Sequence, residues 1–186
     1  MSVEEPKVKL DYQAYCLFPN DGNRHEVIEG RHYINPASTP DHQSVSKYLQ
    51  HFLFTQIELT GVGRVFNAPI DVQLGEYDIV QPDLVVILKP SKATVTRSRI
   101  KGAPNLIMEI LSPSTTKSDL TLKRRLYEQS GVSEYWIVDP AQRAVRQLML
   151  RDGTYHTVAG KKQGRSLAIL PDIKIPLDTV WSKALD

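Results

Sequence analysis

The sequence predicts a single α/β or α+β domain built on a mixed β-sheet. Short apolar runs at residues 84–88 and 106–111 are bounded by turn-forming residues, which is typical of buried strands. Two longer segments, residues 39–60 and 119–130, carry apolar side chains at helical spacing. The elements follow the order helix, three strands, helix and strand, and they end in a hairpin. This order favours helices packed on a mixed sheet.

The first half of the chain begins with an expected arm and continues into a helix. Residues 1–23 are polar and interrupted by proline and glycine, so we expect a loosely attached N-terminal arm followed by one domain over residues 24–186. A short strand is expected at residues 25–30. Thr39-Pro40-Asp41 then combines an N-cap hydroxyl, a proline at the first helical position and an acid in the first turn. The apolar stripe of this helix comprises Val45, Tyr48, Leu49, Phe52, Leu53 and Ile57.

The second half alternates strands with one further helix. Residues 64–74 are predicted as one strand, Tyr77 and Asp78 as turn residues, and residues 89–101 as a basic loop. The helix at residues 119–130 ends at Gly131, as helices commonly do. A strand at residues 134–138 is followed by a hairpin whose turn contains Asp152-Gly153.

The composition sets limits on the function. The 186 residues suit one domain with one core, and a formal net charge of +2 neither requires nor excludes a polyanionic partner. The one cysteine, Cys16, excludes an intramolecular disulfide and a cysteine metal cluster, and we interpret it as a small apolar filler. No stretch resembles a signal peptide or a membrane span. We therefore expect a cytoplasmic protein without a membrane partner.

Two acids on neighbouring buried strands predict a cation site. Glu109 lies inside the apolar run of residues 106–111, where an ionised carboxylate is costly unless it is paired, hydrogen-bonded or metal-bound. Asp83 stands at the start of the run of residues 84–88. Carboxylates are hard ligands that suit Mg²⁺, for which we expect Mn²⁺ to substitute. No paired histidine or cysteine spacing typical of zinc occurs.

Lys123 lies on the helix face that should pack against the sheet. At 100° per residue it shares one arc with Asp119, Leu126 and Tyr127. A lysine there can extend its amine to solvent, or it can pair with Asp119 one turn earlier. Next to two buried acids, it can instead orient an attacking water and stabilise negative charge that develops on a phosphate.

These residues resemble the Uma-two family of the restriction-endonuclease-like PD-(D/E)XK superfamily. The resemblance rests on Pro82-Asp83, on the run from Glu109 to Thr115, on Lys123 and Tyr127, and on the segment 131–140. It extends from about Glu26 to the C-terminal hairpin. It implies a restriction-endonuclease-like core with a mixed central sheet flanked by helices.

The resemblance also implies a catalytic site. Asp83 and Glu109 correspond to metal ligands, together with the carbonyl of Ile110. The usual lysine two residues after the second acid is replaced by Leu111, and the family places a lysine on the next helix, which matches Lys123. Glu26 matches an additional acid, although it can equally be a surface residue like its neighbour Glu29. Many relatives have Gly-Glu where this chain has Gly30-Arg31, so any role of an acid there is lost.

Other polar residues have both a functional and a plain interpretation. His42, at the start of the first helix, either contacts substrate or is an exposed helix-start residue. The hydroxyls of Ser112, Ser114 and Thr115 either cap the second helix or meet a phosphate at its N-terminus. The cluster formed by Arg97, Arg99 and Lys101 either follows a nucleic-acid backbone or is a solvated loop. We expect Tyr127 and Trp136 to pack in the core.

The expected function is a Mg²⁺-dependent endodeoxyribonuclease. Asp83, Glu109 and Glu26 would hold the metal, Lys123 would help place the water, and a homodimer would allow both DNA strands to be cut. The alternative is a catalytically silent nuclease-fold protein that binds nucleic acid or a regulatory partner. RNA is a third possibility that uses the same site.

Overall fold

The chain folds around two mixed β-sheets of six strands each. The computed structural model describes residues 8–35, 37–112, 119–160 and 164–186. The first of these sheets, called the central sheet below, has the strand order β12-β11-β10-β9-β6-β3. Its strands are β3 (Gly63–Asn67), β6 (Leu84–Leu88), β9 (Leu106–Ile110), β10 (Glu134–Asp139), β11 (Ala144–Arg151) and β12 (Thr154–Thr157). Within it, β9 and β10 are parallel and the other neighbours are antiparallel.

The second sheet, called the outer sheet, has the order β2-β1-β5-β4-β8-β7. Its strands are β1 (Arg24–Ile28), β2 (Arg31–Asn35), β4 (Val72–Gly75), β5 (Asp78–Val80), β7 (Thr94–Val95) and β8 (Ile100–Lys101). Two further short strands, β13 (Arg165–Ser166) and β14 (Lys174–Ile175), pair separately near the C-terminus.

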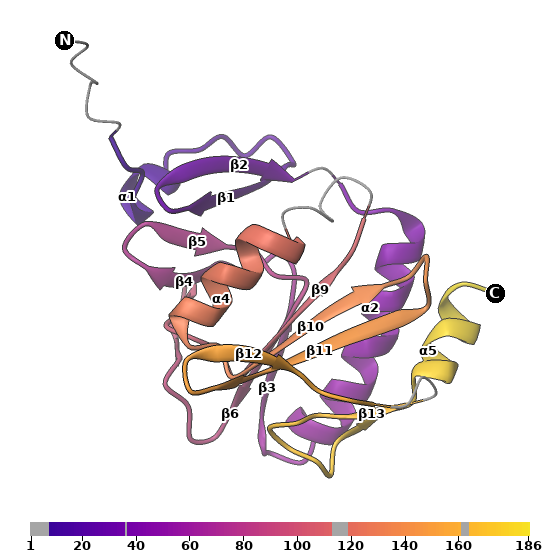
Figure 1. Ribbon diagram of the computed structural model, residues 1–186. Helices are drawn as coiled ribbons and strands as arrows, with labels where there is room; N and C mark the ends of the chain where they lie inside the picture. Colours follow the sequence, from indigo (N-terminus) through magenta and orange to yellow (C-terminus); the bar gives the residue numbers. More distant parts are fainter. Residues whose placement is uncertain (1–7, 36, 113–118, 161–163) are drawn as a thin grey trace.

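Helices cover the two faces of the central sheet (Figure 1). On one face lie α2 (Pro40–Leu53), with its π-helical extension η1 (Phe54–Glu58), and α5 (Leu177–Ala184). On the other face lies α4 (Arg124–Ser130), which continues the π-helical turn η2 (Asp119–Lys123), together with the outer sheet. The buried side chains form one apolar cluster on each face, so alternate residues of a central strand enter different clusters.

The strand register places Asp83 and Glu109 at the same level. Leu84 lies opposite Met108 in the antiparallel pairing of β6 with β9. Asp83 directly precedes Leu84 and Glu109 directly follows Met108, so the two acids are the next residues along neighbouring strands. The outer sheet contributes Glu26 from β1, which packs beside them.

Most of the predicted elements are present. The N-cap at Thr39 is confirmed, because its hydroxyl accepts a hydrogen bond from the His42 amide. Gly131 ends α4 in the left-handed conformation, as expected. The predicted hairpin is the antiparallel pair β11 and β12.

The predicted single strand at residues 64–74 is wrong. It divides into β3 in the central sheet and β4 in the outer sheet. The division falls at Ala68-Pro69, where proline offers no amide hydrogen to continue a strand ladder. Similarly, the basic loop at residues 89–101 contains β7 and β8, and Asp78 begins β5 rather than lying only in a turn.

The described part of the expected arm is attached to the outer sheet rather than loose. The short helix α1 (Tyr12–Tyr15) places the Tyr15 hydroxyl 2.6 Å from Asp71, and the ring of Phe18 stacks on His32. Aromatic side chains in a polar segment supply these contacts. Within the described residues, no helix is long and apolar enough to cross a membrane.

Candidate metal and catalytic centre

Three carboxylates from three strands are buried at the junction of the two sheets. Glu26, Asp83 and Glu109 are 1%, 3% and 2% exposed. Glu26 belongs to β1, Asp83 precedes β6, and Glu109 belongs to β9. Buried carboxylates destabilise a fold unless charge and hydrogen bonds compensate them, so their partners determine what this site can do.

Lys123 joins two of these acids. Its ammonium Nζ lies 3.0 Å from Glu26 Oε1 and 3.1 Å from Glu109 Oε1, and the residue is 2% exposed. The lysine therefore faces the sheet, as its helical position predicts, and does not extend into solvent. The same geometry supports the buried interpretation of Glu26.

Neutral donors hold the same two carboxylates in place. The Tyr127 hydroxyl donates to Glu109 Oε1 at 2.6 Å. Glu26 accepts one hydrogen bond from the side-chain amide of Asn35 and one from the backbone N–H of Gln81, each at 2.7 Å. Burial, followed by the charges of Glu109 and Glu26, raises the pKa of Tyr127 well above its usual value. The phenol therefore stays a hydrogen-bond donor throughout the physiological pH range. Tyr127 packs in the core as predicted, and the prediction missed the hydrogen bond from its hydroxyl to Glu109.

Asp83 has a separate set of partners. Its Oδ1 accepts a hydrogen bond from Arg24 at 2.8 Å, and its Oδ2 accepts one from the Ile110 amide at 2.8 Å and lies 3.0 Å from His42 Nε2. Burial acts to raise the pKa of Asp83, but His42, Arg24 and the Ile110 amide together lower it to about 2. Asp83 is therefore ionised at neutral pH. Ile110, whose carbonyl was predicted as a metal ligand, contacts Asp83 through its backbone N–H.

The donor chemistry of this centre fits a hard divalent cation. Three buried carboxylates offer the oxygen ligands that Mg²⁺ prefers. In the described part of the chain, however, no three acidic, histidine or cysteine side chains are arranged around one point that could hold an ion. Lys123 lies between Glu26 and Glu109, and Arg24 and His42 contact Asp83. A metal ion would therefore enter by taking over contacts that protein cations make here.

The remaining predicted residues divide into those near the centre and those away from it. His42 is buried beside Asp83, so the exposed interpretation of this histidine is wrong. Ser112 follows β9 and lines a cavity together with His42, whereas Ser114 and Thr115 lie outside the described residues. Arg97, Arg99 and Lys101 lie at the β7–β8 edge of the outer sheet. There Arg99 donates to Gln73 and lies over the ring of Tyr12.

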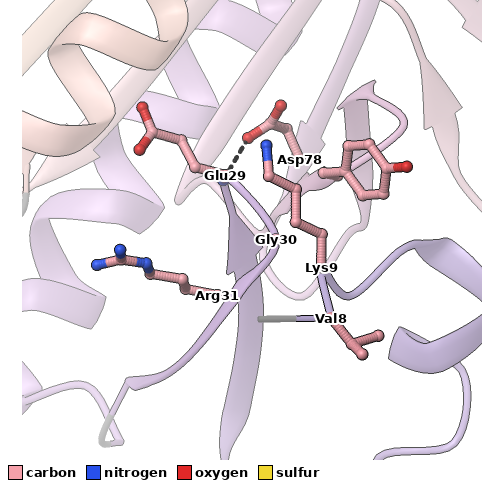
Figure 2. A pocket seen from close by; sticks show the side chains of 7 residues that line it. Val8, Lys9, Glu29, Gly30, Arg31 and Asp78 are labelled. Atoms are coloured by element: carbon pink, nitrogen blue, oxygen red, sulfur yellow. Dashed lines mark hydrogen bonds between the residues drawn. The ribbon is translucent and has the colours of Figure 1, made fainter. Parts of the chain in front are cut away.

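Glu29 does not take part in the centre. It adopts a left-handed backbone conformation (φ 54°) at the turn between β1 and β2, and its amide donates to Asp78. Figure 2 shows its side chain in a surface hollow with Lys9, Arg31 and Asp78. Of the two neighbouring glutamates, Glu26 is therefore the one that reaches the buried acids.

Arg24 is the contact that the sequence prediction missed. Arg24 stands two residues before Glu26 in β1, so the two side chains lie on the same face of the strand. That spacing of two could have identified a cation beside the predicted acids. The partner, Asp83, is 59 residues away in sequence and could not be inferred from spacing.

Comparisons with known proteins agree with this architecture. The family model Uma2, described as "Putative restriction endonuclease", matches residues 10–178. A crystal structure described as "a putative nuclease belonging to DUF820" from Anabaena variabilis ATCC 29413 superposes with a TM-score of 0.75 at 16% sequence identity. The match covers 95% of this chain and 99% of the other. At that identity the likeness shows the fold. No curated protein matches the sequence significantly.

Proposed function

The chain belongs to the Uma2 family, and we propose that it is a Mg²⁺-dependent endonuclease that hydrolyses phosphodiester bonds in DNA. One observation carries the proposal: three carboxylates from separate strands are buried at one junction, and Lys123 lies against two of them. Family membership supports a nuclease, and the buried acids and their cations support metal-dependent hydrolysis.

Asp83, Glu109 and Glu26, with the carbonyl of Ile110, are the residues that would hold Mg²⁺. When bound, Mg²⁺ acidifies a coordinated water and neutralises charge on the phosphodiester. Arg24 and His42 keep Asp83 ionised, so this acid is ready to bind a cation at neutral pH. Tyr127 fixes one oxygen of Glu109, which limits the orientations that the carboxylate can adopt.

Lys123 contributes a positive charge beside the reacting groups. Its ammonium can orient a water through its hydrogen bonds, and it can stabilise negative charge that develops on the phosphate oxygens. Because the amine now lies between Glu26 and Glu109, it must give up at least one of these contacts to act on substrate. The four-carbon side chain of lysine permits such a shift.

A second candidate function is nucleic-acid binding without turnover. The observation that favours it is that Arg24, His42 and Lys123 already satisfy the three carboxylates. A site in which these ion pairs are permanent would bind no metal. Mg²⁺ or Mn²⁺ binding, measured by calorimetry, separates the two functions.

The nuclease proposal is tested by plasmid cleavage in Mg²⁺, with EDTA as the metal-free control. We expect Asp83→Asn and Glu109→Gln to abolish cleavage while the variants stay folded by circular dichroism. Glu26→Gln and Glu29→Gln form a matched pair, because both lie on the same hairpin and only Glu26 contacts Lys123. We expect Glu26→Gln to impair cleavage and Glu29→Gln to leave it intact. Full activity of the Glu109→Gln protein contradicts the proposal.

A further inference from the structure

A small cavity reaches Asp83 from the surface. It has a volume of about 280 Å³ and lies between the first turns of α2, the start of β1 and the end of β3. The lining residues that matter here are Arg24, His42, Gln43, Ser46, Asn67 and Asp83. Of the buried acids, Asp83 is the one that forms part of its wall. The cavity is therefore a route from solvent to one end of the carboxylate centre.

Arg24 supplies a guanidinium group to this cavity, where its charge is balanced by the ion pair with Asp83. One nitrogen, Nη1, binds Asp83, and among the described residues the guanidinium makes no other hydrogen bond. Arginine carries further N–H donors in a rigid plane that matches the oxygens of a phosphate group. The side chain is 19% exposed, so these donors remain within reach of a ligand in the cavity.

His42 lacks a hydrogen-bond partner on the ring nitrogen that does not face Asp83. The residue is 5% exposed, and its Nδ1 is buried without a partner in the part of the chain that the structure describes. Buried polar side-chain atoms in folded proteins nearly always have a partner. His42 therefore lines the cavity with a ring whose Nε2 is held by Asp83, and its Nδ1 has no partner among the described residues.

The rest of the wall is uncharged and combines polar side chains with the small or apolar residues Gly22, Ala37, Ala68 and Pro69. Gln43 and Ser46 lie one turn apart on α2, and Asn67 faces them from the end of β3. Amide and hydroxyl groups of this kind suit the sugar and ester oxygens on either side of a phosphate. The larger hollow shown in Figure 2, about 700 Å³, differs because it is lined by acids and bases that lie close together, and it contains none of the buried carboxylates.

The size of the cavity limits what can enter it. Pockets for ordinary small ligands measure roughly 300–1,000 Å³, so this cavity accepts about one nucleotide unit. An unpaired strand can bend its backbone to bring a phosphate down to the buried Asp83, whereas the stiff backbone of a duplex is held at the surface by its partner strand.

We propose that this cavity binds one phosphate of an unpaired nucleic-acid strand through Arg24 and delivers it to Asp83. The substrate class is then single-stranded nucleic acid, or an unpaired segment of a longer molecule. This inference rests on the proposed nuclease function, because delivery of a phosphate to Asp83 serves cleavage. Binding itself requires neither metal nor turnover.

The test measures binding in EDTA by fluorescence anisotropy. The probes are a short labelled oligodeoxynucleotide, the oligoribonucleotide of the same sequence, and the DNA duplex. The variants are Arg24→Met, Ser46→Leu and Arg31→Met. Ser46→Leu fills the cavity but leaves the Arg24–Asp83 pair in place. Arg31→Met removes the same charge from the same hairpin outside the cavity.

We expect the wild-type protein to bind one or both single strands more tightly than the duplex. Arg24→Met and Ser46→Leu should each weaken single-strand binding about tenfold or more, as for the loss of a charge-assisted hydrogen bond. Arg31→Met should change it much less, because Arg31 lies outside the cavity and its loss leaves the cavity contacts in place. Should Arg24→Met fail to fold, Ser46→Leu still decides the matter.

Two results would overturn the proposal: tighter binding of the duplex, or unchanged single-strand binding by Ser46→Leu. The outcome is separable from that of the nuclease proposal. Unchanged binding by the cavity variants, with Mg²⁺-dependent cleavage that requires Glu109, removes the cavity proposal alone. Cavity-dependent binding without Mg²⁺-dependent cleavage of either the plasmid or the single-stranded oligonucleotides removes the nuclease proposal alone.

Discussion

Two buried glutamates on neighbouring strands of the central sheet differ in one partner: Glu109 contacts a cation in addition to the neutral Tyr127, whereas Glu134 is held by neutral donors among the described residues. Glu109 of β9 faces α4 and contacts the ammonium of Lys123. Glu134 of β10 faces the α2 side, where it accepts hydrogen bonds from the Trp136 indole at 2.5 Å and the Gln147 amide at 2.7 Å. The backbone amide of Ile169 completes the set for Glu134 at 2.8 Å.

If the proposed function holds, the difference separates a structural acid, Glu134, from a metal-binding acid, Glu109. Neutral donors fixed in strands and backbone cannot leave Glu134, so this glutamate holds the C-terminal segment against the sheet. The ammonium of Lys123 is a mobile cation on a flexible chain, and another cation can replace it. Within the described residues Glu134 has no ion pair, whereas Glu26, Asp83 and Glu109 each contact a cationic side chain.

The largest expected effect is the loss of cleavage in Glu109→Gln but not in Glu134→Gln. Both substitutions remove one buried carboxylate from the same sheet at nearly constant volume. If only Glu109 serves the reaction, its loss should slow Mg²⁺-dependent plasmid cleavage about a thousandfold, as when other groups that stabilise transition-state charge are removed. Equal losses of activity in the two variants would mean that each glutamate supports the fold and that Glu109 has no separate role in cleavage.

The next effect is on stability and concerns Lys123→Met. This change leaves Glu26 and Glu109 buried without the ammonium, which should lower the free energy of unfolding by about 3–5 kcal/mol in EDTA. Mg²⁺ should restore more stability to this variant than to the wild type, because the cation replaces the lost charge. Urea unfolding with and without Mg²⁺ measures both quantities. Arg125→Met, on the same helix and exposed, is the control. A Lys123→Met protein as stable as that control contradicts the prediction.

Acid should act on Asp83 in a narrow pH range. Its folded-state pKa of about 2 lies below its ordinary value of 3.8, so ionised Asp83 stabilises the fold at higher pH. That stabilisation, about 2 kcal/mol, is fully present above about pH 4 and is lost as the pH falls through about 2. The dependence of unfolding free energy on pH in this range should become shallower in Asp83→Asn. An unchanged slope would show that Asp83 is not the titrating group.

The smallest expected effect on cleavage is that of Glu134→Gln, which should act on stability alone. Glutamine at position 134 replaces one carboxylate oxygen with an NH₂ group, which then faces one of the N–H donors that Glu134 now accepts from. The expected cost is about 1–3 kcal/mol of unfolding free energy, with no change in cleavage. Thermal unfolding and the plasmid assay measure the two properties. A stable variant with impaired cleavage would place Glu134 in the reaction instead.

The sequence predicts those parts of the fold that depend on local pattern. The apolar runs at β6 and β9, the N-cap at Thr39 and the glycine after α4 are all local features, and each is present. The division of residues 64–74 between two sheets was missed, although Pro69 marks it locally, because strand-forming residues stand on both sides of the proline. Which sheet a strand joins is decided by partners distant in sequence.

The candidate site shows the same limit. The spacing of Lys123 on its helix correctly predicted a buried lysine, and the apolar run around Glu109 correctly predicted a buried acid. The pairing of Arg24 and His42 with Asp83 depends on contacts across 59 and 41 residues, which no local pattern reveals. The exposed interpretation of His42 rested on its place at the start of a helix, which does not reveal this contact.

The central claim is that a divalent cation can take the place of protein cations at the buried carboxylates. A crystal structure of the protein soaked in Mn²⁺ tests it most directly, because anomalous scattering locates the ion. We predict one ion or more in contact with carboxylate oxygens of Asp83 and Glu109, with Lys123 displaced from at least one glutamate. Crystals in which Lys123 still bridges Glu26 and Glu109, and no Mn²⁺ lies beside Asp83, would contradict it.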